Sequence, residues 1–126
     1  MNIDLNELFS VRNRSVVITG GASGIGFAVA STLTDRGANV TLLDRDRQKL
    51  ESAVQNLSGR EGKIRGAPCD VKDSGSLRRE FDSAASKQGG IDIVFAIAGM
   101  RRPSATPANW RPASIPIPSK CSLIRI

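Results

Sequence analysis

Two hydrophobic patterns alternate along the first hundred residues. Short runs of β-branched and aliphatic residues are typical of strands buried on both faces of a sheet. Longer stretches repeat an apolar residue every three or four positions, as an amphipathic helix does. The strand-like runs cover residues 15–19, 39–43, 64–69 and 91–97, and the helix-like stretches cover residues 24–36, 46–58 and about 74–88.

Each predicted helix carries an apolar stripe and is followed by glycine, which commonly terminates a helix. Strands that alternate with helices through short turns predict right-handed crossovers and a parallel sheet. We therefore expect an α/β, doubly wound domain of about four strands and three helices. The stripes are Ile25, Ala28, Val29 and Leu33 in the first helix, Leu50, Ala53, Val54 and Leu57 in the second, and Leu77, Phe81, Ala84 and Ala85 in the third.

The chain changes character after Gly99. Residues 101–126 hold five basic residues, no acidic residue and five of the six prolines. Because proline neither continues a helix nor donates a hydrogen bond in a central strand, we expect an irregular tail. This divides the chain into a partial domain over residues 1–100 and a basic, Pro-rich tail over residues 101–126. The basic residues form no clustered run, so no nucleic-acid partner is predicted.

Composition excludes several kinds of chemistry. The chain has no His, and its two cysteines, Cys69 and Cys121, have no metal-ligand spacing, so no metal site is predicted. It also has no Tyr, which together with His most often transfers protons in enzymes. No apolar stretch approaches the ~20 residues of a membrane span, and the acidic Asp4 and Glu7 are atypical of a signal peptide. We expect a cytoplasmic protein without a membrane partner.

A glycine-rich segment joins the first predicted strand to the first predicted helix. Such a turn brings backbone N–H groups and the positive end of a helix against a pyrophosphate, although tight turns and close packing also require glycine. Its position between a strand and a helix favours a phosphate-binding role over a purely structural one. The candidate residues are Gly20, Gly21, Ala22, Ser23, Gly24, Ile25 and Gly26.

Asp44 ends the second predicted strand, where a carboxylate can accept hydrogen bonds from the adenosine ribose of a dinucleotide. It can also be read as an acid at the start of the next helix. A carboxylate there repels a 2′-phosphate and Ser23 supplies no cation, so NAD is favoured over NADP. The neighbouring Arg45 is a candidate contact that weakens this preference, because its guanidinium can reach such a phosphate.

Together with Cys69-Asp70-Val71 after the third strand and Ala98-Gly99 after the fourth, these motifs resemble the short-chain dehydrogenase/reductase family over about residues 10–100. The resemblance implies a Rossmann-type fold and an NAD(P)-dependent oxidoreductase acting on an alcohol/carbonyl pair. It also implies that Asp70 and Val71 contact the adenine, although Asp70 can instead cap the next helix. Ala98 and Gly99 would line the cofactor. The family's usual Asn-Asn before that Ala-Gly is replaced by Ala96-Ile97.

The family's catalytic Ser, Tyr and Lys lie beyond the fourth strand, and this chain has no Tyr. We therefore assign no catalytic residue and expect the chain to keep only the cofactor-binding half, inactive alone. The alternatives are a non-catalytic dinucleotide-binding module and a non-functional truncated product. The family's oligomer is not expected, because its interface helices lie after the fourth strand. Unless the tail covers it, the outer edge of that strand is expected to be exposed and prone to aggregation.

Overall fold

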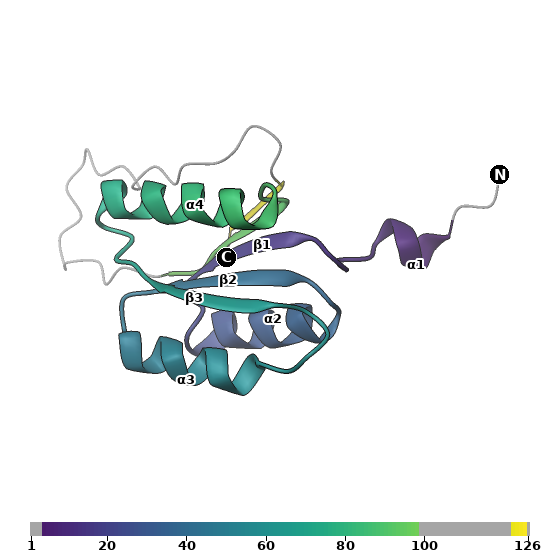
Figure 1. Cartoon of the computed structure of the whole chain (residues 1–126), viewed down its shortest axis with the longest axis horizontal. Coiled ribbons are helices and arrows are strands. Elements are labelled where there is room, and N and C mark those ends of the chain that lie inside the picture. Colours follow the sequence, from purple (N-terminus) through teal and green to yellow (C-terminus); the bar gives the residue numbers. More distant parts are fainter. Residues whose placement is uncertain (1–3, 99–121, 126) are drawn as a thin grey trace.

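A five-stranded, all-parallel sheet forms the centre of the computed structural model, which describes residues 4–98 and 122–125 (Figure 1). The strand order is β3-β2-β1-β4-β5. Strands β2 and β3 lie on one side of β1, and β4 and β5 lie on the other side. The chain thus adds strands outward from β1, first in one direction and then in the other. This is the doubly wound arrangement. The strands are β1 Ser15–Thr19, β2 Asn39–Asp44, β3 Ile64–Pro68, β4 Ile93–Ala96 and β5 Ser122–Arg125.

Helices lie on both faces of this sheet (Figure 1). Helices α2 and α3 pack on one face, and α4 packs on the other. A short N-terminal helix, α1, lies apart from these layers, beyond the first residue of β1. The helices are α1 Leu5–Leu8, α2 Gly24–Asp35, α3 Arg47–Leu57 and α4 Ser74–Gln88. The predicted α/β, Rossmann-type fold class is thereby confirmed, with α1 as an unpredicted addition.

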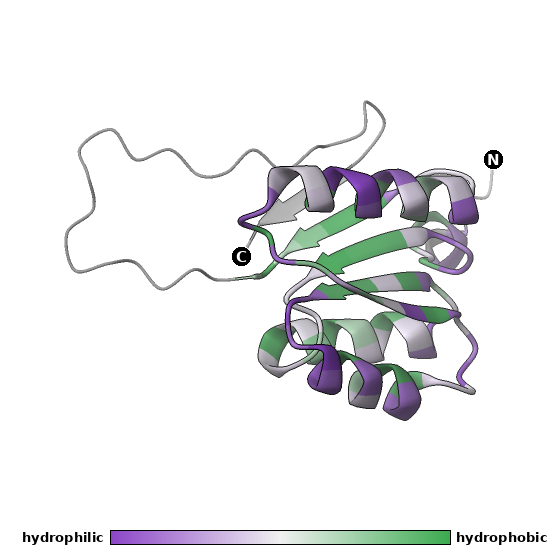
Figure 2. Cartoon of the chain, turned by 60° about the vertical axis from the view of Figure 1, so that its left-hand side comes forward, coloured by the Kyte–Doolittle hydropathy of each residue, from purple (hydrophilic) through white to green (hydrophobic). Residues whose placement is uncertain are grey.

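The central strands are apolar because both of their faces are covered. All five residues of β1 are buried, as are the four interior residues of β2. Figure 2 shows hydrophobic central strands lying between α3 and α4, both of which carry many hydrophilic residues. Helices α3 and α4 bury the stripes expected for them, centred on Leu50, Ala53 and Leu57 and on Leu77, Phe81 and Ala84.

Helix α2 is rotated relative to the stripe that the sequence predicted for it. Its buried residues are Gly26, Ala30 and Thr34, whereas Ile25 is 59% exposed. Small residues on the buried side let a helix approach a sheet closely. Of the predicted stripe, Val29 and Leu33 are half-buried and pack against the core, as expected. The expectation was wrong for Ile25 and Ala28, which are exposed.

Aspartates begin two of the helices. The side chain of Asp46 accepts a hydrogen bond from the backbone N–H of Lys49, and that of Asp73 accepts one from Ser76, each at 3.1 Å. Each bond satisfies one of the N–H groups that the first turn of a helix leaves without a partner. These caps fix where α3 and α4 start, close to the carboxyl ends of β2 and β3.

The end of the chain contributes a strand where the sequence predicted an irregular tail. Residues 122–125 form β5, which pairs with β4 in parallel, with Phe95 opposite Ile124. The outer edge of β4 is therefore paired, because the tail covers it, which is the condition under which no exposed edge was expected. The expectation of an irregular tail rested on the prolines at positions 103–118, whereas Ser122–Arg125 contains no proline and is free to donate to a neighbouring strand. Residues 99–121 and the boundary predicted after residue 100 lie outside the described residues.

Candidate functional site

A cleft of about 660 Å³ opens at the carboxyl ends of β1, β2, β3 and β4. It lies beside β1, where the strand connections change direction, and open parallel sheets bind ligands at such a point. Because all strands run the same way, the residues that follow them meet at this one edge. The lining residues are Gly20, Ser23, Ile25, Leu43, Asp44, Arg45, Cys69, Asp70, Val71, Lys72, Ile97 and Ala98.

The glycine-rich turn forms one wall of the cleft. The backbone N–H of Gly20 donates to the carbonyl oxygen of Leu43 at 2.7 Å, which ties the turn to the end of β2. Ser23 is the N-cap residue of α2, yet its side chain makes no capping hydrogen bond. A β-carbon on Gly24, whose φ is +59°, would meet no atom of residues 4–98 and 122–125 within 4 Å. The mouth of the turn is therefore open, with the N-terminus of α2 facing it.

Asp44 lies opposite this turn and its carboxylate contacts two backbone segments. One oxygen, Oδ2, accepts a hydrogen bond from the N–H of Ala22 at 3.2 Å, and Oδ1 accepts one from the N–H of Asp46 at 3.1 Å. A carboxylate has about four lone-pair sites, so both oxygens keep capacity for another donor. Asp44 is not the cap of α3, since Asp46 fills that role.

Asp70 and Val71 follow β3 and form the far wall. The Oδ1 of Asp70 accepts a hydrogen bond from the N–H of Lys72 at 3.0 Å, and the cap of α4 is Asp73. The alternative that Asp70 caps this helix is therefore wrong. Val71 is half-buried and packs against the core beneath α4 while also lining the cleft.

The end of β4 closes the cleft beside β1. The N–H of Ala98 donates to Oγ1 of Thr19 at 3.4 Å, and the N–H of Ile97 donates to the Thr19 carbonyl at 3.2 Å. Thr19 is buried, so these bonds fix the backbone of the Ala98 region against the start of the glycine-rich turn. Gly99, also predicted as a site residue, lies outside the described residues.

Most of the residues predicted for the site line the same cleft. Gly21 and Gly26 instead lie buried beneath the turn, while Ala22 and Gly24 line a neighbouring groove between α2 and α3. Sequence reasoning missed Leu43, Lys72, Ile97 and the side of Cys69 that faces the cleft. Their position in the sequence could have identified them, because each lies within two residues of a predicted contact at the carboxyl end of a strand.

Cys69 lies in the wall of the cleft as a buried thiol. The residue is 5% exposed, and burial raises the pKa of Cys69 above its ordinary value, assisted by the nearby carboxylates of Glu80, Asp70 and Asp73. A hydrogen bond with Ser76 at 3.8 Å acts in the opposite direction. Cys69 therefore carries a neutral thiol in this wall of the cleft at neutral pH.

Two kinds of site are absent from residues 4–98 and 122–125. No three His, Cys, Asp or Glu side chains there come together in a way that would hold a metal ion. Within the same residues, no helix has the length and apolar character needed to cross a membrane.

Comparison with known proteins relates the chain to one family. The sequence pattern of the family described as short chain dehydrogenase matches residues 14–112. D-threitol dehydrogenase of Mycolicibacterium smegmatis is 36% identical over 94 residues, which are 75% of this chain and 36% of that protein. The 2,3-dihydro-2,3-dihydroxybenzoate dehydrogenase of Bacillus subtilis is 36% identical over 93 residues, 74% of this chain and 36% of that protein. The chain thus spans just over a third of these relatives.

Solved structures agree with this relationship. A short-chain type dehydrogenase/reductase from Mycobacterium ulcerans superposes with a TM-score of 0.72 at 34% identity, covering 75% of this chain and 35% of that one. NAD⁺-bound xylitol dehydrogenase superposes with a TM-score of 0.69 at 30% identity, covering 72% and 35% of the two chains. The match to the family pattern, the glycine-rich turn and the doubly wound sheet lead to one conclusion: this chain belongs to the short-chain dehydrogenase family.

Proposed function

We propose that this chain binds NAD in the cleft at the carboxyl ends of its strands, as the cofactor-binding part of an oxidoreductase that acts on an alcohol/carbonyl pair. The observation that carries the proposal is the position of the Asp44 carboxylate. It lies in the cleft, opposite the open mouth of the glycine-rich turn. An acidic group at this distance along the chain suits a ribose, and the N-terminus of α2 suits a pyrophosphate.

The residues present fit a dinucleotide. The turn provides backbone N–H groups, and Ser23, which lines the cleft, provides a hydroxyl without a capping partner. We assign the pyrophosphate to the segment Gly20–Gly26 and the adenosine ribose to Asp44. Asp70 and Val71 would contact the adenine, and the backbone of Ala98 and Gly99 would line the path toward the nicotinamide. The bound nicotinamide supplies hydride transfer.

The charges around the ribose site support NAD rather than NADP. A 2′-phosphate at the ribose would lie against the carboxylate of Asp44, and Ser23 offers no opposing charge. Arg45 also lines the cleft and is exposed, so it is the residue that would accommodate such a phosphate. We propose that the repulsion by Asp44 prevails because its carboxylate is held by two backbone hydrogen bonds.

The names of two relatives support the proposed reaction class. D-threitol and xylitol are the alcohols named in the dehydrogenases described above. We propose an alcohol/carbonyl pair on that basis for the oxidoreductase to which this cofactor-binding part corresponds. We further propose that the chain alone binds cofactor without turnover, because it contains no Tyr to serve as the family's proton donor.

The test is a titration of the purified full chain with NADH and, separately, with NADPH, followed by nicotinamide fluorescence. We expect saturable NADH binding, with NADPH weaker by about tenfold because of charge repulsion at Asp44. The Asp44→Ala variant should bind NADH about tenfold less tightly, since charge-assisted hydrogen bonds are lost. Replacement of the exposed Glu51 of α3 by Gln removes the same charge outside the cleft and should leave both affinities unchanged.

Absence of saturable NADH binding by a folded chain would contradict the proposal. Oxidation of an alcohol by the chain alone, measured as NADH formation, would contradict the proposed lack of turnover but leave cofactor binding intact. A chain that fails to give a cooperative melt and binds no cofactor would favour the truncated-product alternative.

A further inference from the structure

We infer that Asp44 has a second role, which rests on the proposed function: it positions the glycine-rich turn for the pyrophosphate, in addition to any contact with the ribose. A carboxylate that only meets ribose hydroxyls affects ligands that contain the adenosine ribose. A carboxylate that holds the turn also affects ligands that contain no ribose at all.

Three successive backbone N–H groups of the turn point back to the end of β2. Those of Gly20 and Gly21 donate to the carbonyl oxygen of Leu43, at 2.7 and 3.5 Å. That of Ala22 donates to Oδ2 of Asp44 at 3.2 Å. Of these three hydrogen bonds, only the one from Ala22 is accepted by a side chain. It is also the one nearest to Ser23 and Gly24, where α2 begins. Its removal releases the part of the turn that faces the proposed pyrophosphate.

The Asp44 side chain is itself held in one orientation. Its other oxygen accepts the N–H of Asp46, the residue that caps α3. The carboxylate therefore connects the residues that precede α2 and α3. Ala22, before α2, is 22 residues away from Asp44 in sequence, and Asp46, before α3, is two residues away. A bridge of this kind sets the distance between the two helix N-termini, and hence the direction of the free N–H groups at the start of α2.

The other carboxylate in the cleft provides a contrast. Among the residues that the structure describes, Asp70 accepts one hydrogen bond, a local one from the N–H of Lys72 to its Oδ1. It carries the same charge but does not contact the turn. The positioning role is therefore specific to Asp44 and does not follow from negative charge in the cleft.

Loss of the positioning role and loss of the negative charge change the affinity for an anion in opposite directions, which makes the inference testable. If Asp44 acts only through its charge, its removal lowers repulsion and tightens the binding of an anion. If it positions the turn, its removal weakens the binding of that anion, because the N–H groups no longer converge. The sign of the change separates the two cases.

Inorganic pyrophosphate is the probe, titrated into the ¹⁵N-labelled full chain while the amide resonances of Gly20, Ala22 and Gly24 are followed. We expect Asp44→Ala to weaken pyrophosphate binding by about tenfold, as for loss of a hydrogen bond to a charged group. Asp44→Asn also removes the charge but keeps the size and one acceptor oxygen, so it should bind pyrophosphate more tightly than Asp44→Ala. Glu51→Gln, with the same charge change outside the cleft, should bind pyrophosphate like the unaltered chain.

A second measurement follows the hydrogen exchange of the Ala22 amide without ligand. We expect it to exchange about tenfold faster in Asp44→Ala, whereas amides at the centre of β1 keep their protection. If Asp44→Ala fails to fold, Asp44→Leu, which keeps the size of the side chain without an acceptor oxygen, takes its place in both measurements.

Pyrophosphate affinity that is unchanged or higher in the variant, with NADH affinity lowered, would overturn the positioning role and leave the proposed cofactor site standing. If the unaltered chain binds neither NADH nor pyrophosphate, the proposed function fails. The Ala22 exchange then decides the inference: unchanged protection in the variant overturns it, and faster exchange supports Asp44 as the anchor of the turn.

Discussion

A β-carbon on Gly26, in the first turn of α2, would lie 2.1 Å from the carbonyl oxygen of Gly20. No real β-carbon comes so close to a backbone oxygen, so glycine at position 26 is what allows α2 to start directly beneath the turn. From the sequence alone, Gly20 and Gly26 are only two members of a glycine-rich segment, and their close approach cannot be seen.

The Gly26→Ala substitution should therefore destabilise the fold strongly. Because the clash is with backbone, relief requires α2 to shift, and we expect a loss of about 3 kcal/mol in the free energy of unfolding. Gly59→Ala is the matched control: its φ is +81° but the added carbon meets open space, so about 1 kcal/mol is expected. Urea unfolding of both variants checks this. Equal losses would show that the close approach of α2 is not needed for stability.

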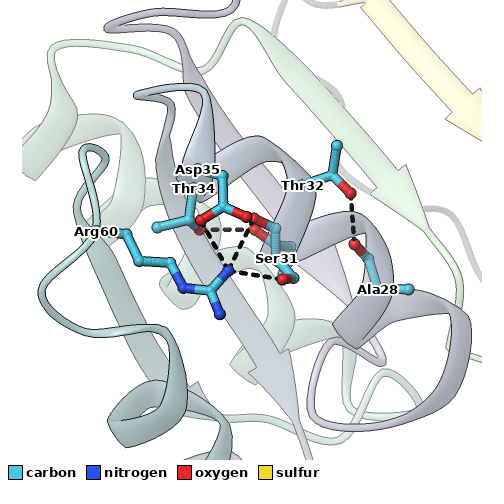
Figure 3. A network of polar contacts seen from close by, with 7 residues as sticks. Ala28, Ser31, Thr32, Thr34, Asp35 and Arg60 are labelled. Atoms are coloured by element: carbon cyan, nitrogen blue, oxygen red, sulfur yellow. Dashed lines mark hydrogen bonds and ion pairs between the residues drawn. The ribbon is translucent and has the colours of Figure 1, made fainter.

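Arg60, in the loop after α3, joins that loop to the last turns of α2 (Figure 3). Its Nη1 donates to Oγ of Ser31 at 2.7 Å and to Oδ1 of Asp35 at 2.9 Å, and the arginine side chain is 31% exposed. We expect Arg60→Ala to lower the free energy of unfolding by about 1 kcal/mol, since a partly buried guanidinium loses several partners.

Arg12 provides the control for Arg60. It pairs with Glu61 at 3.1 Å, but the two side chains are 61% and 55% exposed. Solvent screens such a pair, so Arg12→Ala should change the free energy of unfolding by no more than about 0.5 kcal/mol. Chemical unfolding at low and high salt measures both variants. A larger effect of Arg12→Ala than of Arg60→Ala would contradict the argument from burial.

Removal of residues 122–126 should expose the outer edge of β4. Without β5, the N–H and C=O groups on that edge lose their strand partners, and an open parallel edge promotes association between chains. We expect faster hydrogen exchange in Ile93–Ala96, a lower melting temperature and concentration-dependent light scattering. A chain shortened by Ile126 alone is the control. Unchanged exchange in β4 after the longer deletion would show that β5 is not part of the sheet in solution.

The alkylation of Cys69 should depend on both pH and cofactor. Its raised pKa means that less thiolate is present at a given pH than in an unfolded chain, so reaction with iodoacetamide should begin at higher pH in the folded protein. Replacement of Cys121 by Ser leaves Cys69 as the sole thiol for mass spectrometry. Because Cys69 lines the cleft, saturating NAD should slow its alkylation. Equal rates in folded and urea-unfolded chains would contradict the effect of burial.

The pattern of the sequence predicted four strands and three helices within a few residues of their observed bounds. It succeeded because these elements are governed by local rules: β-branched runs such as 15–19 form buried strands, and stripes such as Leu50, Ala53 and Leu57 turn one face of a helix to the core. In α2 the same rules held for Val29 and Leu33, which pack against the core, and failed for Ile25 and Ala28, which are exposed. The buried side of this helix is formed by Gly26, Ala30 and Thr34.

By itself, the sequence determined the order of four strands and three helices and the parallel arrangement of those strands. It also determined the edge of the sheet at which the candidate residues meet, because the carboxyl ends of parallel strands share one edge. Only the tertiary structure decided which atoms face the cleft and what they contact. It set Asp44 across the turn from Ala22, turned Ile25 outward and paired β5 with β4. These relations join residues far apart in sequence, and such contacts depend on how helices and strands pack, which no local pattern encodes.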